Sequence, residues 1–213
     1  MNTDELIERI AEKDIDIDAF VHLAIHNESI RAEIVHQMLT HPAIMVYYHC
    51  YYVVEKASRE HPEIYYPYWN DIAHLLHHAN SYHRDFAVEI IGNLTKVDRE
   101  DRFPAVADEY FSIINDEKFM TGNCCVKNLL KVYRHRSEQR RRIIQTLLEI
   151  DERCDYTEKQ KAVLKADVLE IFDAVYDVEP ARNRINAFIK NELDSISPKT
   201  RRKAKQLVRK YRL

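Results

Sequence analysis

Five stretches of this chain carry the same helical apolar stripe, and the stripes recur at nearly even intervals. One anchor residue taken from each stripe gives successive spacings of 37, 38, 43 and 36 residues. The anchors are Cys50, Ala87, Cys125, Val168 and Ala204. Apolar residues three and four positions apart mark one face of an α-helix, and a recurrence near forty residues leaves room for two helices per unit. The sequence therefore predicts an all-α chain of about six helix pairs.

Helix signals fill the intervals between the stripes, and no segment alternates apolar and polar residues over the length of a strand. The predicted helices cover 3–12, 15–26, 28–40, 43–60, 62–78, 81–97, 103–116, 119–135, 137–151, 157–177, 179–194 and 198–211. Only two of the 213 residues are glycine. P-loops and doubly wound dinucleotide-binding folds need glycine where the backbone approaches phosphate, so both classes are excluded.

In period and pattern the chain resembles the HEAT/armadillo-like superfamily over essentially its whole length. The resemblance implies one domain over residues 1–213, wound as a right-handed α-α superhelix (a HEAT-like solenoid), with the second helix of each pair lining a concave groove. Positions opposite each apolar stripe, at 100° per residue, would face that groove. They are Tyr48, Tyr52, Glu55, Asp85, Glu89, Asn123, Lys127, Arg134 and Glu170. Their mixed charge favours a non-enzymatic module that binds a protein partner.

Tyrosine is concentrated at the start of this groove, with seven of the 13 tyrosines between residues 47 and 68. Exposed tyrosines four apart on a helix give a rigid contact area that loses little entropy on binding. We therefore expect Tyr48 and Tyr52 to anchor the partner. The remaining rings of the region that we expect to pack between repeats are Tyr65, Tyr66, Tyr68 and Trp69.

Charge is unevenly distributed. Residues 197–213 hold eight basic residues and no acidic one, whereas residues 1–196 hold 24 basic and 35 acidic residues. The tail fits a solvated last helix whose cations favour its C-terminal end, or a nucleic-acid contact. In the second case the contacts would be Arg140, Arg141, Arg142, Arg201, Arg202 and Lys205. Similarity to the HEAT-like alkylpurine-DNA glycosylases would then imply base repair, but those enzymes place several tryptophans near the lesion, and this chain has one.

The histidines and cysteines do not form a recognisable catalytic or metal site. Two helical stripes are expected to face solvent: Asp18, His22 and His26, and Asp71, His74 and His78. The His-Glu dipeptides that supply iron ligands in HEAT-like di-iron hydroxylases do not occur. The four cysteines lack CxxC spacing and are expected to be reduced, with Cys125 buried. We expect no metal, no cofactor and no membrane contact, in a cytoplasmic protein.

Both glycines, Gly92 and Gly122, fall inside predicted helices. Glycine within a helix costs about 1 kcal/mol relative to alanine, so each position is expected to mark a close approach. Gly92 is expected on the groove side and Gly122 near the core stripe.

Overall fold

The computed structural model describes residues 3–213, and this part of the chain contains helices and no β-strand. The prediction of an all-α chain is confirmed. The residues group into two compact units, Met1–Asp108 and Glu109–Leu213, and the boundary falls within one helix. One domain over residues 1–213 stays a prediction, and each unit is described by itself. Within 3–213, none of the helices has the length and apolar character that crossing a membrane requires.

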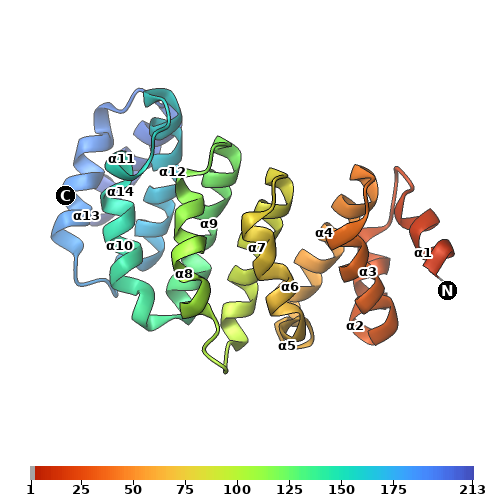
Figure 1. The fold of residues 1–213 in the computed structure, drawn as a ribbon. Coiled ribbons are helices and arrows are strands. Elements are labelled where there is room, and N and C mark those ends of the chain that lie inside the picture. Colours follow the sequence, from red (N-terminus) through yellow and green to blue (C-terminus); the bar gives the residue numbers. More distant parts are fainter. Residues whose placement is uncertain (1–2) are drawn as a thin grey trace. The chain divides into compact units, whose positions relative to one another are not determined.

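Unit 1 is built around one long central helix, α4 (Figure 1). Its helices are α1 (Thr3–Ile10), α2 (Ile17–His26), α3 (Glu28–Thr40), α4 (Ile44–Glu60), α5 (Pro62–Tyr65), α6 (Trp69–His74), α7 (Ser81–Leu94) and the start of α8 (Phe103–Ser112). Helix α4 packs against α2, α3 and α7. Side-chain oxygens of Asp16, Asn27 and Asn80 accept backbone N–H groups at the starts of α2, α3 and α7, because the first N–H groups of a helix have no partner inside it.

Unit 2 has its own central helix, α12, which packs against α9 and α14. Its helices are the end of α8, α9 (Phe119–His135), α10 (Arg140–Leu148), α11 (Ile150–Arg153), α12 (Glu158–Val175), α13 (Arg182–Asn191) and α14 (Pro198–Tyr211). Thr157 and Gln160 form a capping box at the start of α12. Ser197 caps α14, and Pro198 takes its first position, where a missing N–H costs nothing.

Three predicted helices were wrong in their extent. The predicted helix 137–151 is divided, because α10 ends at Leu148 and α11 begins at Ile150. The predicted helix 62–78 is interrupted by a short 3₁₀ turn, Tyr66–Tyr68, between α5 and α6. Pro67 lies inside this turn, and proline removes a helical N–H. The predicted helix 179–194 begins only at Arg182. The Glu179 carboxylate accepts the N–H of Ala181 in the turn before it, which holds that segment outside the helix.

Hydrogen bonds join positions about one predicted repeat apart in both units. They run from one helix or turn to its counterpart 38 to 40 residues later, and they tie side chains to carbonyls or carboxylates. Examples are Tyr51–Glu89 and Asn93–Glu55 in unit 1, and Tyr156–Asp116 and Thr200–Ala162 in unit 2. Within each unit, the spacing seen in the sequence is thus also a spacing of contacts.

Gly122 marks a close approach, as predicted. A Cβ at this position of α9 would lie 2.0 Å from the Tyr156 hydroxyl oxygen and 2.6 Å from the Ile114 carbonyl oxygen. Tyr156 is fixed there because its hydroxyl donates to the Asp116 carbonyl at 2.8 Å. Gly92, in contrast, is buried in α7, so the prediction that it opens onto a binding groove was wrong.

The thiols are free, and three of the four are buried. Burial raises the pKa of Cys50 to about 12 and that of Cys154 to about 11, because desolvation disfavours the thiolate. Cys125 is buried, as predicted, and its burial raises the pKa of the thiol well above its usual value. Cys124 alone among them is half-buried.

Candidate functional site

An exposed cluster of large apolar side chains lies on α4 and α7 of unit 1. Met45 and Tyr52 on α4 are 41% and 46% exposed, and Tyr82 on α7 is 40% exposed. Tyr48 is half-buried between them, with its ring centroid 5.2 Å from those of both Tyr52 and Tyr82. Because α-helical positions repeat at 100°, residues 45, 48 and 52 share one face of α4. We call Met45, Tyr48, Tyr52 and Tyr82 the aromatic patch.

Buried rings support the aromatic patch from below. Tyr51 stacks on Phe86 with centroids 4.0 Å apart, and Tyr48 meets Phe86 edge-on at 5.4 Å. Tyr47 lies 4.8 Å from the ring of buried His83. Rings held by other rings lose little side-chain entropy when a partner binds. The predicted exposure of Tyr52 is confirmed. Tyr48 is only half-exposed, because its ring also packs against buried Phe86.

Acidic side chains lie on the same two helices as the patch. Glu89 accepts the Tyr51 hydroxyl at 2.6 Å, and Glu55 accepts Arg59 at 3.3 Å. Glu55, Asp85 and Glu89 are all half-buried. By helical position, Glu55 lies on the face of α4 that carries Tyr48 and Tyr52, and Asp85 and Glu89 lie on the face of α7 that carries Tyr82. One groove through these residues stays a prediction. Met45 was missed, although its place one turn before Tyr48 could have indicated it.

The predicted groove residues of unit 2 do not form a comparable surface. Asn123 is only 6% exposed, and its prediction as a surface residue was wrong because α9 packs on both the turn after α8 and α12. Lys127 and Arg134 are exposed on α9. Glu170 is exposed too, but it accepts Lys203 of α14 at 2.5 Å. It therefore contributes to packing within the unit.

The eight basic residues of the tail divide into two groups. Four are used internally: Lys199 pairs with Asp167, Arg201 donates to the Ser195 carbonyl, Lys203 pairs with Glu170 and Asp173, and Lys210 pairs with Asp173. The Lys203 side chain is nearly buried by these contacts. The other four are Arg202, Lys205, Arg209 and Arg212, which have no ion pair or side-chain hydrogen bond with residues 3–213. Four of the eight cations thus contribute to packing within unit 2, and the nucleic-acid contact stays a prediction.

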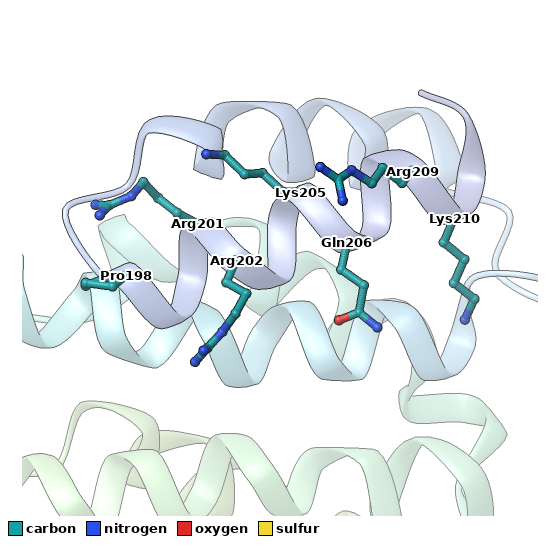
Figure 2. A pocket seen from close by; sticks show the side chains of 7 residues that line it. All are labelled: Pro198, Arg201, Arg202, Lys205, Gln206, Arg209 and Lys210. Atoms are coloured by element: carbon teal, nitrogen blue, oxygen red, sulfur yellow. The ribbon is translucent and has the colours of Figure 1, made fainter.

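Three of the unpaired cations, Arg202, Lys205 and Arg209, are exposed on α14 and line one hollow. At 100° per residue, positions 202, 205 and 209 fall within about 60° of each other. Figure 2 shows Arg201, Lys205 and Arg209 projecting to one side of the helix and Arg202, Gln206 and Lys210 to the other, along a shallow hollow that begins at Pro198. Its lining contains no acidic residue. We call Arg202, Lys205 and Arg209 the basic stripe.

The three predicted arginines of α10 have different environments. The Arg142 guanidinium lies over the Phe111 ring at 4.1 Å. Arg140 donates from Nε to the Tyr133 carbonyl at 3.0 Å and lies over the Tyr133 ring at 5.2 Å. Arg141 is exposed and has no side-chain partner within 3–213. Arg140 and Arg141 line one pocket with Arg184 of α13, a juxtaposition that the sequence did not predict.

The histidine stripes occur on the surface, as expected. His22 and His26 are exposed and stack at 4.3 Å between centroids. His74 is exposed and His78 is half-buried. Over residues 3–213 the structure contains no group of three or more side chains placed to hold a metal ion.

Comparisons with known proteins bear on the fold alone. No protein-family model matches the chain, and none of the curated proteins searched matches it. Among solved structures, it is similar to an engineered protein whose crystal structure comes from the Northeast Structural Genomics Consortium. The TM-score is 0.53 at 14% identity, with 96% of each chain covered. At this identity the likeness supports an all-helical fold and carries no information on activity.

Proposed function

We propose that this chain is a non-enzymatic protein-interaction module, built as a HEAT-like solenoid, and that the aromatic patch is its binding surface. The exposure of Met45, Tyr52 and Tyr82 around Tyr48 carries the proposal. Interface energy concentrates in aromatic side chains held rigid at the centre of a contact. The hydrogen bonds that recur 38 to 40 residues apart support the solenoid. The free thiols suit a reducing cytoplasm.

The partner is a protein segment that carries apolar and basic side chains. Unit 1 holds 9 basic and 19 acidic residues, and Glu55, Asp85 and Glu89 lie on the two helices of the patch. Charge complementarity of this kind steers encounter and selects partners more than it adds affinity. The apolar residues of the segment would cover the rings, and its cations would meet the acidic border.

Selection from a random peptide library tests the proposal. Selected peptides should be enriched in Lys or Arg beside aromatic and aliphatic residues, and their affinity should fall as salt rises. Tyr52→Ala with Tyr82→Ala should weaken binding at least tenfold, since each ring contributes about 1–2 kcal/mol. Met120→Ala is the matched control, because Met120 is an exposed apolar residue of α9 in unit 2.

Two outcomes would contradict this proposal. One is equal binding of the selected peptides by the double variant and the Met120→Ala control. The other is a stable dimer of the parent chain, seen by sedimentation, that the double variant dissociates. In that case a second copy of the chain, and not another protein, would cover the patch.

The basic stripe supports a second candidate function, nucleic-acid binding. Three exposed and unpaired cations that line one hollow along α14 could follow a phosphate backbone. Trp69 is buried in unit 1, so it is not available to stack on a base, and base repair gains no support. Arg202→Glu, Lys205→Glu and Arg209→Glu together should abolish oligonucleotide binding and its salt dependence. The control variant changes three exposed lysines to glutamate, Lys127, Lys159 and Lys190. It changes the net charge by the same amount and should weaken oligonucleotide binding much less. An equal loss of binding in both triple variants would refute the proposal that the basic stripe binds nucleic acid.

A further inference from the structure

A pocket in unit 2 brings two adjacent arginines together with a third that is distant in the sequence. Arg140 and Arg141 come from the first turn of α10, and Arg184 comes from the first turn of α13. The pocket has a volume of about 660 Å³, within the range of roughly 300–1,000 Å³ that is typical of small-molecule sites. None of its lining residues belongs to the aromatic patch or to the basic stripe.

The arginines are available to a ligand to different degrees. Arg140 is oriented by its bond to the Tyr133 carbonyl and by the ring beneath it, and its two terminal nitrogens have no partner within residues 3–213. Arg141 makes no side-chain hydrogen bond or ion pair there. Arg184 makes none either, although its charge, after hydrogen bonds from Gln145 and Arg153, helps to lower the pKa of Glu149. Guanidinium groups with unused N–H donors match the oxygens of phosphate in bidentate fashion.

The single acid that lines the pocket is already satisfied. Glu179 is buried, and its Oε2 accepts the Tyr133 hydroxyl at 2.7 Å while its Oε1 accepts the Ala181 N–H at 3.2 Å. Burial and the bond to Glu179 raise the pKa of Tyr133 to about 12, so the phenol stays neutral. Three arginines and one carboxylate leave a net charge of +2, which a phosphomonoester dianion would balance.

Apolar groups complete the pocket beside the arginines. Ile144 and Pro180 line it, and Val178 at its edge is 72% exposed. A bare inorganic ion would leave these groups uncovered and most of the volume empty. We propose that the pocket binds the phosphomonoester of a small organic molecule, with the arginines on the phosphate and the apolar edge on the organic part.

Phenyl phosphate and inorganic phosphate are the probes, measured by calorimetry at fixed ionic strength. Arg141→Gln and Arg184→Gln should each weaken both probes about tenfold. Val178→Ala should weaken phenyl phosphate several-fold and leave inorganic phosphate unchanged. Lys190→Gln removes one exposed cation from the same helix, α13, outside the pocket, and should leave both affinities unchanged. Affinity for phenyl phosphate should also fall from pH 7.5 to pH 5.5, as its second ionisation (pKa about 6) is reversed.

Three results would overturn the proposal. If Lys190→Gln and Arg141→Gln weakened the binding of the probes equally, the probes would be held by the general positive charge of the unit and not by the pocket. Binding of benzoate as tight as that of phenyl phosphate would mean a carboxylate site. Displacement of phenyl phosphate by an oligonucleotide without terminal phosphates, at matched phosphate concentration, would assign the pocket to a nucleic-acid backbone. Circular dichroism of each variant shows that a loss of binding is not a loss of fold.

Discussion

The two units use the same kind of helix packing with opposite surface chemistry. Unit 1 holds 9 basic and 19 acidic residues, and unit 2 holds 23 basic and 16 acidic residues. In unit 1 the contact between α4 and α7 includes packed aromatic rings, whereas in unit 2 the contact between α12 and α14 includes a network of ion pairs. The same helix arrangement is thus compatible with different contact chemistry and with surfaces of opposite net charge.

The largest effect is expected from Gly122→Ala, which should destabilise unit 2 by about 3 kcal/mol through overpacking. The new Cβ would meet the Tyr156 hydroxyl and the Ile114 carbonyl. Trp69, the single tryptophan, reports on unit 1, whereas circular dichroism reports on both. The urea concentration at the midpoint of unfolding should fall further when it is measured by circular dichroism than when it is measured by Trp69 fluorescence. Equal shifts would mean that the units unfold together. Adding Tyr156→Phe should recover part of the loss.

Asp173→Asn should cost unit 2 about 2 kcal/mol, because it breaks the network beneath α14. Burial opposes ionisation of Asp173, but bonds from Lys210, Tyr211 and Lys203 outweigh it and lower its pKa to about 2. A lowered carboxyl pKa stabilises the fold above the unfolded value near 3.8, and this stability is lost as pH falls from about 4 to 2. The variant should lack that loss in urea titrations. Asp177→Asn, at an exposed residue just after α12, should retain it.

A smaller effect is expected in unit 1 at milder pH. Burial, with the charge of His78, lowers the pKa of His83 to about 4. The neutral form is then favoured in the fold, so this stability is complete above pH 6.5 and is lost as pH falls towards 4. Between pH 7.5 and 5, Trp69 fluorescence in urea should report a loss of about 1.5 kcal/mol. In the His83→Phe variant, the free energy of unfolding should change much less over this pH range. His22→Asn, at an exposed histidine, should keep the parent's pH dependence. If the His83→Phe variant keeps it too, the pH dependence does not come from His83.

Local signals predicted the helices, and failed where one residue changed the backbone. The segments 28–40, 119–135 and 198–211 were predicted at their observed bounds. Side-chain caps begin the first and the last of them, whereas 119–135 has no side-chain cap and was indicated by its apolar spacing. The segment 62–78 failed at Pro67. A helical wheel also misplaced Asn123, because a helix with neighbours on two sides buries residues opposite its main apolar stripe. The wheel assumes one buried face, whereas α9 is covered by the turn after α8 and by α12.

The candidate sites were predictable only in part, because they depend on which distant side chains meet. Tyr52 could be found from its four-residue spacing to Tyr48, since both lie on one helix. The division of the basic tail could not, because Lys203 meets Glu170 and Asp173 from a helix about thirty residues earlier. The pocket of Arg140, Arg141 and Arg184 depends on the approach of α10 and α13. The sequence contains no local signal for either contact.

The unequal burial of the four thiols has a practical consequence for spectroscopy. Cys50, Cys125 and Cys154 are buried and held as thiols by their raised pKa values, and the thiolate is the form that reacts with maleimides. Cys124 should therefore accept a fluorophore or spin label first, with no mutagenesis. It lies on α9 in unit 2, and Trp69 lies in unit 1, so the natural chain already holds a donor and an attachment point for an acceptor, one in each unit.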